Sequence, residues 1–415
     1  MFEKRFKSHH DVKAVIGTHF KSMKRMGTAE EIEILFNSYP KEENGVLYTH
    51  VPFCDKICSF CNLNRKQLDN DLEDYTKFLI SEYEKYGATN YMKNKKLEAI
   101  YFGGGTPTIF RADQLEKILA SIKENFTLTD DYEFTFETTL HNLTNEKLDV
   151  LERMGVNRLS IGVQTFSNRG RQILNRTYDK ETVTKRIAEL KKNFSGLICI
   201  DIIYNYPDQT LEEVREDAEL VSKLMIDSVS FYSLMIHEGS KMSKDIQEEV
   251  FQLNYELEKD RELHNTFMKT LLSTDEYEVL EHTKIIRKGK DKYKYITLSN
   301  KGADILPVGI GAGGKLNNFE IFRMNPERQF FSFTGEEEQK IKKLSGLFQY
   351  PNVSFVKIKD YISEKAFDKL HNLFIQLQKE GFMDVYEDHI ELKGDGVFWG
   401  NNIGREVIKI SLEEE

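Results

Sequence analysis

Cysteine and proline are scarce in this sequence, and long apolar runs are missing. The 415 residues include four cysteines and seven prolines, which excludes a disulfide-stapled secreted scaffold and a proline-rich disordered chain. No stretch approaches the roughly 18 consecutive apolar residues of a membrane-spanning helix. The segment Met1–Arg5 also lacks the apolar core of a signal peptide. We therefore expect a cytoplasmic protein without membrane insertion.

Positive charge is also in deficit. The 58 basic residues are outnumbered by 68 acidic ones, which gives a net charge of −10 at pH 7. This sign does not suit a protein that coats nucleic acid, so no nucleic-acid partner is expected. Apolar content is ample, because 40% of the residues are hydrophobic. The length allows two or three domains at about 150 residues each.

Apolar or β-branched runs alternate with helix-period segments between residues 46 and 233. The runs are Val46–Val51, Leu97–Phe102, Tyr132–Phe136, Arg158–Val163, Leu197–Tyr204 and Ser228–Ser233. Amphipathic segments such as Leu72–Tyr83 lie between them. Six units of this kind, joined by right-handed crossovers, predict an α/β fold whose parallel sheet curls into a partial (β/α)6 barrel, with functional groups where the strands end.

The pattern changes after residue 240. Long polar helices are predicted between Lys244 and Leu272, and the basic stretch Lys284–Lys294 follows. Next come the glycines of segment 309–314, a helix with apolar residues from Phe367 to Leu377, and a hairpin within Phe382–Leu392. The helix and hairpin predict a smaller C-terminal α+β module of winged-helix type. The expected division is an N-terminal helical extension (1–45), the partial barrel with the helices that follow it (46–300), and the glycine-rich segment with the C-terminal module (301–415).

Three of the four cysteines lie within eight positions, directly after the first predicted strand. Cys54, Cys58 and Cys61 form the pattern Cys-x3-Cys-x2-Cys, and Cys199 stands apart. A structural zinc site needs four ligands and would have to borrow a distant histidine or Cys199. A [4Fe–4S] cluster held by three cysteines instead leaves one iron open to a ligand. The spacing favours the cluster, with zinc or buried thiols as the alternatives.

The segment Leu47–Cys61, LYTHVPFCDKICSFC, resembles the radical S-adenosylmethionine enzymes, in the branch that contains oxygen-independent coproporphyrinogen oxidase. The resemblance spans residues 45 to 410 and is strongest in the barrel half. It implies a [4Fe–4S] cluster on Cys54, Cys58 and Cys61, with the open iron chelated by the amino and carboxylate groups of S-adenosylmethionine. In this superfamily an electron from the reduced cluster cleaves the S–C5′ bond and releases a 5′-deoxyadenosyl radical.

A glycine-rich motif follows the second predicted strand. In Gly103-Gly104-Gly105-Thr106-Pro107, residues without Cβ let the backbone approach a ligand and aim N–H groups at a carboxylate. Read alone, such a triplet also makes a tight turn. In the family this motif forms the site for the amino-acid end of S-adenosylmethionine, which assigns Gly104, Gly105 and Thr106 to cofactor binding.

Further polar and aromatic residues follow the family order along the strands. The resemblance assigns to S-adenosylmethionine the residues Tyr48, Phe60, Glu137, Gln164, Arg176 and Asp201. Read alone, Gln164 would cap a strand and Arg176 would be a surface charge. Asp201 is flanked by isoleucines in a buried strand, so it must be paired or face a polar site, because an isolated buried charge is too costly. Phe60 would lie near the adenine or shield the cluster.

Three tetrapyrrole-related groups of this branch are candidates. Coproporphyrinogen oxidases carry a further cysteine two places after the third, where this chain has Leu63, which counts against decarboxylation. The other two groups are haem chaperones and the anaerobic haem-degrading methyltransferases. The segment Asn300–Lys315 resembles the haem-degrading group. This implies that haem is the substrate and that S-adenosylmethionine chemistry methylates and opens the ring without oxygen, which releases iron and a linear tetrapyrrole. A haem chaperone is the alternative.

The basic stretch Lys284–Lys294 has three interpretations. It would pair with haem propionates, dock an acidic flavodoxin-type electron donor, or form a solvated loop. Tyr232 and His237 follow the sixth strand and are candidate haem ligands, with an ordinary exposed histidine as the alternative for His237. His50 is predicted to support the cysteine loop by hydrogen bonding. A zinc-bound regulatory or nucleic-acid-binding module is a third class of function, which the net charge disfavours.

Overall fold

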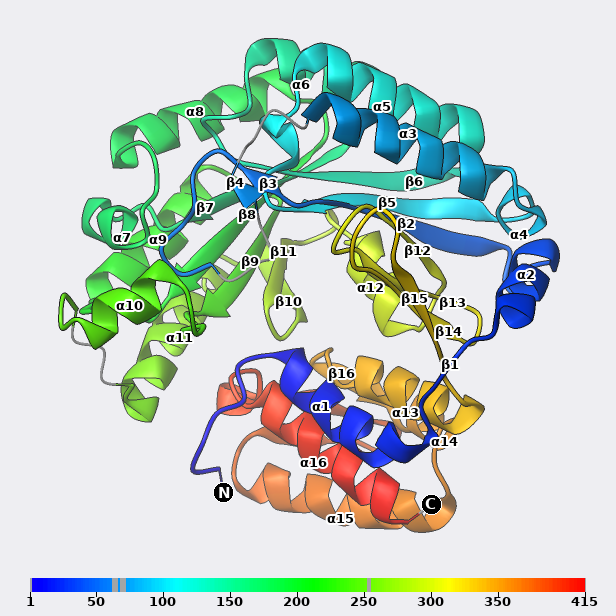
Figure 1. Cartoon of the computed structure of the whole chain (residues 1–415). Helices are drawn as coiled ribbons and strands as arrows, with labels where there is room; N and C mark the ends of the chain where they lie inside the picture. Colours follow the sequence, from blue (N-terminus) through cyan, green and yellow to red (C-terminus); the bar gives the residue numbers. More distant parts are fainter. Residues whose placement is uncertain (1, 62–65, 68–71, 252–254, 415) are drawn as a thin grey trace.

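The computed structural model describes residues 2–61, 66–67, 72–251 and 255–414. Figure 1 shows a curled sheet wrapped on its outer side by helices, and below it a mainly helical layer that holds both ends of the chain. None of the helices in the described ranges has the length and apolar content needed to cross a membrane.

The six predicted parallel strands are confirmed. They are β2 (Asn44–Val51), β5 (Lys96–Gly104), β6 (Thr127–Thr138), β7 (Arg158–Gln164), β8 (Leu197–Tyr204) and β9 (Ser228–Ser233). They lie side by side in this order, and every neighbouring pair is parallel. Buried parallel strands read as apolar runs because both of their faces are covered, which is why the sequence reveals them.

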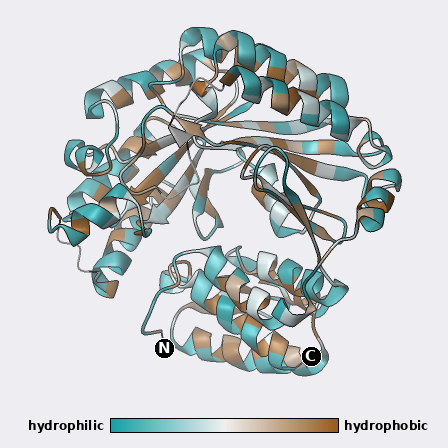
Figure 2. Ribbon diagram, viewed as in Figure 1, coloured by the Kyte–Doolittle hydropathy of each residue, from teal (hydrophilic) through white to brown (hydrophobic). Residues whose placement is uncertain are grey.

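Helices cover the outer face of these strands (Figure 1). They are α3 (Leu72–Gly87), α5 (Ala112–Asn125), α6 (Asn145–Arg153), α8 (Lys180–Asn193), α9 (Leu211–Lys223) and α11 (Leu257–Leu272). Figure 2 shows apolar residues concentrated on the strands and polar residues on the outward surfaces of the helices. This distribution places the main core between the sheet and its helical cover.

Shorter elements join these units. They are η1 (Phe20–Met23), α2 (Ala29–Asn37), β3 (Phe53–Cys54), β4 (Lys66–Gln67), α4 (Asn90–Lys93), η2 (Pro107–Ile109), α7 (Asn168–Ile173), α10 (Lys241–Gln247) and α12 (Lys294–Asn300). The long helices predicted between Lys244 and Leu272 correspond to α10 and α11, and residues 252–254 of that prediction lie outside the described residues.

The sheet extends beyond the six strands on both sides. On one side β12 (Ile305–Val308) pairs in parallel with β2, followed by β13 (Gly313–Leu316), β14 (Phe319–Arg323), β15 (Gln329–Phe333) and β1 (Arg25–Met26). On the other side β11 (Lys284–Arg287) and β10 (Tyr277–Glu281) are antiparallel. The structure therefore differs from the expected division at residue 301, because residues 305–333 belong to the sheet rather than to the C-terminal module.

The C-terminal module packs around a second apolar core. It contains α13 (Glu336–Leu347), β16 (Asn352–Ser354), α14 (Phe355–Lys359), α15 (Glu364–Lys379), β17 (Met383–Val385), β18 (His389–Leu392), η3 (Gly394–Gly396) and α16 (Gly400–Glu413). The predicted helix and hairpin are confirmed as α15 and the β17–β18 pair, to which β16 adds a third strand. The N-terminal helix α1 (His9–His19) joins this core through Val12 and Ile16, so residues 1–45 divide between the module and the sheet.

Candidate active site

A cavity of about 200 Å³ lies where the parallel strands end and the cysteine loop begins. Functional groups are expected at this edge of a parallel sheet. The cavity brings together these residues singled out in the sequence: Cys54, Cys58, Phe60, Cys61, Gly104, Gly105, Thr106, Glu137, Gln164, Arg176 and Asp201. Only Tyr48, among the residues assigned to the cofactor, does not line it.

The cysteine loop is held in place by hydrogen bonds to two helical segments. The Ser59 hydroxyl donates to the Ile173 carbonyl at the end of α7 (2.8 Å), and the Asn175 amide donates to the Ile57 carbonyl (2.8 Å). The Met242 amide of α10 donates to the Ser59 carbonyl (2.8 Å). These bonds fix the backbone of the loop, and all three cysteines line the cavity.

Arg176 places a positive charge beside one of the sulfur atoms. Its Nη1 lies 2.7 Å from Cys58 Sγ, and its Nη2 donates to the carbonyl of Gly162. Because cysteine binds metal as the thiolate, a guanidinium in this position would stabilise the charged ligand. In the described part of the chain, no three His, Cys, Asp or Glu side chains gather around one metal-ion position. The three cysteines instead line a common cavity, as ligands of separate iron atoms would.

The glycine-rich motif packs the end of β5 against the cysteine loop. A Cβ on Gly105 would lie 2.2 Å from the Phe53 carbonyl oxygen and 3.0 Å from Cys54 Sγ. Gly104 adopts φ 115°, and a Cβ there would lie 2.8 Å from the Val51 carbonyl oxygen. Both positions therefore require glycine. The close approach shown here is to the cysteine loop and the end of β2, and the approach to a ligand stays a prediction.

Two carboxylates stand on the cavity wall. Desolvation, together with the nearby Asp201, raises the pKa of Glu137 to about 7, although hydrogen bonds oppose the shift. These bonds come from the Tyr101 hydroxyl (2.6 Å) and the Gly104 amide (3.0 Å). Desolvation also raises the pKa of Asp201, against the attraction of Lys284 and a hydrogen bond from Ser230. The prediction that Asp201 faces a polar site is thus confirmed.

Two buried polar atoms of the cavity lack a partner among the described residues. They are the Oε1 acceptor of Gln164 and the Nε donor of Arg176. Gln164 also adopts φ 72°, a backbone conformation that costs a non-glycine residue energy and that is found most often at functional sites. Buried polar atoms are normally satisfied, so the cavity fits a ligand that carries both donors and acceptors, as S-adenosylmethionine does.

Tyr48 lies below the cavity rather than in its wall. Its hydroxyl shares a 2.8 Å hydrogen bond with His50 Nδ1, and its ring stacks 6.0 Å from that of Tyr295. The carbonyl of His50 accepts a hydrogen bond from the Tyr75 hydroxyl. That His50 supports the cysteine loop stays a prediction.

The structure corrects the loop interpretation for the start of the basic stretch and leaves it open for residues 288–293. Residues 284–287 form strand β11, and Lys284 is buried inside the barrel. Lys288, Lys290 and Lys292 are exposed. His237, a candidate haem ligand, lies after β9 and does not line the cavity. The remaining lining residues were missed from sequence: Lys56, Thr138, Thr139, His141, Ser160, Gly162, Asn175 and Thr177. The alternation of inward positions along β7 could have revealed Ser160 and Gly162.

Comparisons with known proteins identify the barrel. Residues 48–221 match the family model described as Radical SAM superfamily. The chain is 28% identical over 369 residues to the protein named heme chaperone HemW of Lactococcus lactis, covering 86% of this chain and 95% of that protein. It is 26% identical over 388 residues to the anaerobilin synthase of Escherichia coli O157:H7, covering 90% of this chain and 86% of that protein.

The fold has a close counterpart among solved structures. Coproporphyrinogen III oxidase (HemN) from Escherichia coli superposes with a TM-score of 0.77 at 20% identity, covering 92% of this chain and 93% of that one. At this identity the likeness concerns the fold alone. The match extends over nearly the whole chain and confirms the predicted α/β fold, which contains a partial barrel.

Proposed function

We propose that this chain, whose residues 48–221 match the model of the radical S-adenosylmethionine superfamily and which is similar to HemW and anaerobilin synthase, acts on haem and opens the porphyrin ring with S-adenosylmethionine. The observation that carries the proposal is the cavity that joins the three cysteines to eight of the residues assigned to the cofactor. The superfamily uses a [4Fe–4S] cluster and S-adenosylmethionine. Once bound, these groups supply one-electron radical chemistry.

Each wall of the cavity has a distinct task in this proposal. Cys54, Cys58 and Cys61 hold the cluster, and the backbone at Gly104 and Gly105 receives the amino-acid end of S-adenosylmethionine. Thr106 belongs to the same motif. The rest of the cofactor is bound by the carboxylates of Glu137 and Asp201, the amide of Gln164 and the guanidinium of Arg176. Phe60 lines the cavity while its ring packs on an apolar cluster, so it excludes water from the reacting atoms.

Haem degradation is favoured by the glycine-rich segment that resembles the haem-degrading group. A Cβ on Gly309 would lie 2.3 Å from the His50 carbonyl oxygen, and one on Gly311 would lie 3.1 Å from the His50 ring. Both glycines adopt positive φ. The segment therefore packs beside the start of the cysteine loop, which is a contact that a plain surface turn would not require. The name anaerobilin synthase of one relative agrees with this proposal.

Haem delivery is the second candidate. It is supported by the relative named heme chaperone HemW, 95% of whose length aligns with this chain. A chaperone would bind haem at the same end of the barrel and release it unchanged. The two proposals differ in the fate of the macrocycle, so one experiment separates them.

The deciding experiment incubates the anaerobically reconstituted and reduced protein with haem and S-adenosylmethionine. We expect the haem absorption to disappear, with release of iron and a methylated linear tetrapyrrole detected by mass spectrometry. The reaction without S-adenosylmethionine is the control. Bound haem that persists unchanged, with no tetrapyrrole product, would reject degradation and leave the chaperone function.

Electron delivery gives a second prediction. We expect the triple substitution Lys288→Glu, Lys290→Glu and Lys292→Glu to slow cluster reduction by flavodoxin by about tenfold at low salt, because this exposed patch would steer an acidic donor. Stopped-flow absorbance would measure the rate, and dithionite should still reduce the variant normally.

A matched control changes the same charge on the C-terminal module. It replaces Lys357, Lys359 and Lys379, all exposed, by glutamate and should leave the flavodoxin rate unchanged. Equal rates for both triple variants and the wild type would remove this docking site.

A further inference from the structure

Three inward-facing residues form a row across neighbouring strands behind the cavity. Asp201 of β8 pairs directly with Ser230 of β9, and Ser230 pairs directly with Lys284 of β11. Residues paired in register on adjacent strands lie on the same face of a sheet. The backbone register therefore fixes the order Asp201, Ser230, Lys284, which leads from the cavity wall into the barrel interior.

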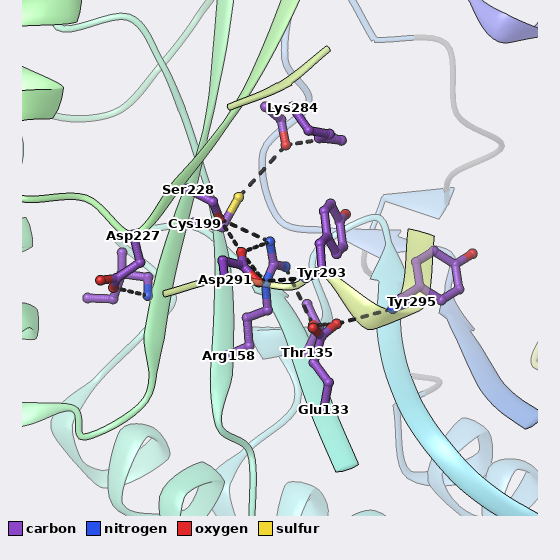
Figure 3. A network of polar contacts seen from close by, with 12 residues as sticks. Glu133, Thr135, Arg158, Cys199, Asp227, Ser228, Lys284, Asp291, Tyr293 and Tyr295 are labelled. Atoms are coloured by element: carbon purple, nitrogen blue, oxygen red, sulfur yellow. Dashed lines mark hydrogen bonds and ion pairs between the residues drawn. The ribbon is translucent and has the colours of Figure 1, made fainter. Parts of the chain in front are cut away.

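Lys284 is a buried ammonium group with polar partners. Its side chain is on the inner face of β11 (Figure 3), the residue is only 6% exposed, and its Nζ donates to the Ser230 hydroxyl (2.6 Å) and to the Tyr232 hydroxyl. The rings of Tyr232 and Tyr293 lie 4.6 Å and 5.3 Å from the ammonium. These partners orient the ammonium but carry no formal negative charge.

The charge of Lys284 is balanced by nearby buried carboxyls rather than by a direct ion pair. Although desolvation lowers it, the pKa of Lys284 stays above its usual value because Tyr232, Tyr293 and Asp201 favour the ammonium. Among the described residues, no carboxylate forms a direct ion pair with Lys284. A buried ion needs compensation. Lys284 favours the ionised forms of three buried carboxyls, Asp201, Glu137 and Glu281. Glu281 pairs with Lys284 from β10, whereas Asp201 is the one that lies in the row with Ser230 on the cavity side.

We infer that Lys284 is a positioning residue that keeps Asp201 ionised and turned toward the cavity, so that this carboxylate can accept hydrogen bonds from the hydroxyl or ammonium groups of S-adenosylmethionine. The inference rests on the cofactor site proposed above. It adds a residue of β11, a strand that lies outside the matched range 48–221. The cofactor site then depends on the second half of the chain as well as the first.

Other charged and titratable groups also face Asp201. Arg158 and Arg176 lower its pKa, and Glu137, Tyr101 and Tyr232 interact with its charge. Desolvation opposes the ionised form of Asp201, and among the groups that favour this form Lys284 has the largest effect. Removing the ammonium should therefore move the ionisation of Asp201 to higher pH, while the other groups stay in place.

The test is the affinity of the anaerobically reconstituted protein for S-adenosylmethionine, measured by equilibrium dialysis. Lys284→Met keeps the length of the side chain and removes its charge. We expect the dissociation constant to rise by about tenfold at pH 7, because without the ammonium most of the Asp201 carboxyl would be protonated at that pH and could no longer accept these hydrogen bonds. The ratio of the variant's constant to that of the wild type should fall as the pH rises toward 9, because Asp201 then ionises without help.

Asp201→Asn and the double variant show whether Lys284 acts through Asp201. If it does, Lys284→Met should cost little affinity in the Asp201→Asn background, because the carboxylate it serves is gone. Additive losses, or an unchanged affinity of Lys284→Met beside a weakened Asp201→Asn, would overturn the inference alone. An unchanged affinity of Asp201→Asn would overturn the cofactor site itself.

Two further variants guard against misfolding. Lys95→Met removes another buried lysine, one paired with Asp304 (2.9 Å) at the amino end of β5, and should leave the affinity unchanged. Ser230→Ala removes the hydroxyl that accepts from Lys284 Nζ (2.6 Å) and that stands between Lys284 and Asp201 in the strand pairing. It should weaken binding in the same pH-dependent way, and wild-type affinity in this variant would contradict the inference even if Lys284→Met does not fold.

Discussion

Cys54→Ala is expected to reduce bound iron by more than about tenfold after anaerobic reconstitution and to abolish cleavage of S-adenosylmethionine, because structural metal sites depend on each ligand. Cys54 Sγ lies 3.6 Å from the Thr106 hydroxyl at the cavity wall, so it is placed between the cluster loop and the glycine-rich motif. Iron and sulfide analysis would measure the first effect, and chromatography of 5′-deoxyadenosine would measure the second.

Cys199→Ala is the matched control. Cys199 is 1% exposed on β8, where its thiol lies 3.8 Å from the Ser230 hydroxyl, and it does not line the cavity. We expect this variant to keep its iron and its cleavage activity. Loss of iron from Cys199→Ala, or retention of iron by Cys54→Ala, would show that the cluster ligands are assigned wrongly.

The parallel part of the sheet could be predicted because its strands carry their own signal. Leu197–Tyr204, for example, is an unbroken apolar run except for Asp201, as expected of a strand covered on both faces. Strands β12 and β11 have only four residues each, too few to carry a clear signal of this kind. β12 has four residues and pairs with β2, which lies far earlier in the chain, so only the tertiary fold reveals the contact.

In the candidate site, too, residues in local sequence motifs could be predicted, whereas residues placed by the tertiary fold could not. The cysteine motif and the motif Gly103–Pro107 are local patterns. The three cysteines and residues 104–106 line the cavity. Tyr48 does not line the cavity, and its contact with S-adenosylmethionine stays a prediction, because no sequence pattern specifies how deep a residue lies in the barrel. Lys284 was hidden because a lysine in a basic stretch is usually solvated, and only strand register shows that this one points inward.

Asp291→Asn is expected to destabilise the folded protein by about 3–5 kcal/mol, because it leaves the charge of Arg158 buried without its partner. Arg158 is fully buried, and its Nε and Nη2 donate to Asp291 Oδ2 at 2.9 Å and 2.8 Å. The Tyr293 amide and the Ser228 hydroxyl donate to the same carboxylate (Figure 3). The midpoint of urea unfolding would measure the loss.

The effect of Asp291→Asn should also depend on pH in a defined direction. Although desolvation raises it, the pKa of Asp291 lies below its usual value because Arg158 favours the carboxylate. A carboxyl group with a depressed folded-state pKa contributes its full stability above the unfolded pKa of about 3.9 and loses it as the pH falls through the folded pKa. The difference between variant and wild type should therefore be constant from neutral pH to about pH 5 and shrink in stronger acid.

A nearby exposed aspartate separates burial from charge. Asp131 pairs with Lys294 at 2.6 Å, but its side chain is 75% exposed, so water can replace the lysine when the charge is removed. Asp131→Asn should unfold close to the wild-type midpoint at every pH. If Asp291→Asn does the same, the buried pair contributes nothing beyond a surface contact. If only Asp291→Asn loses stability, the buried pair of Arg158 and Asp291 stabilises the packing of β7 inside the barrel.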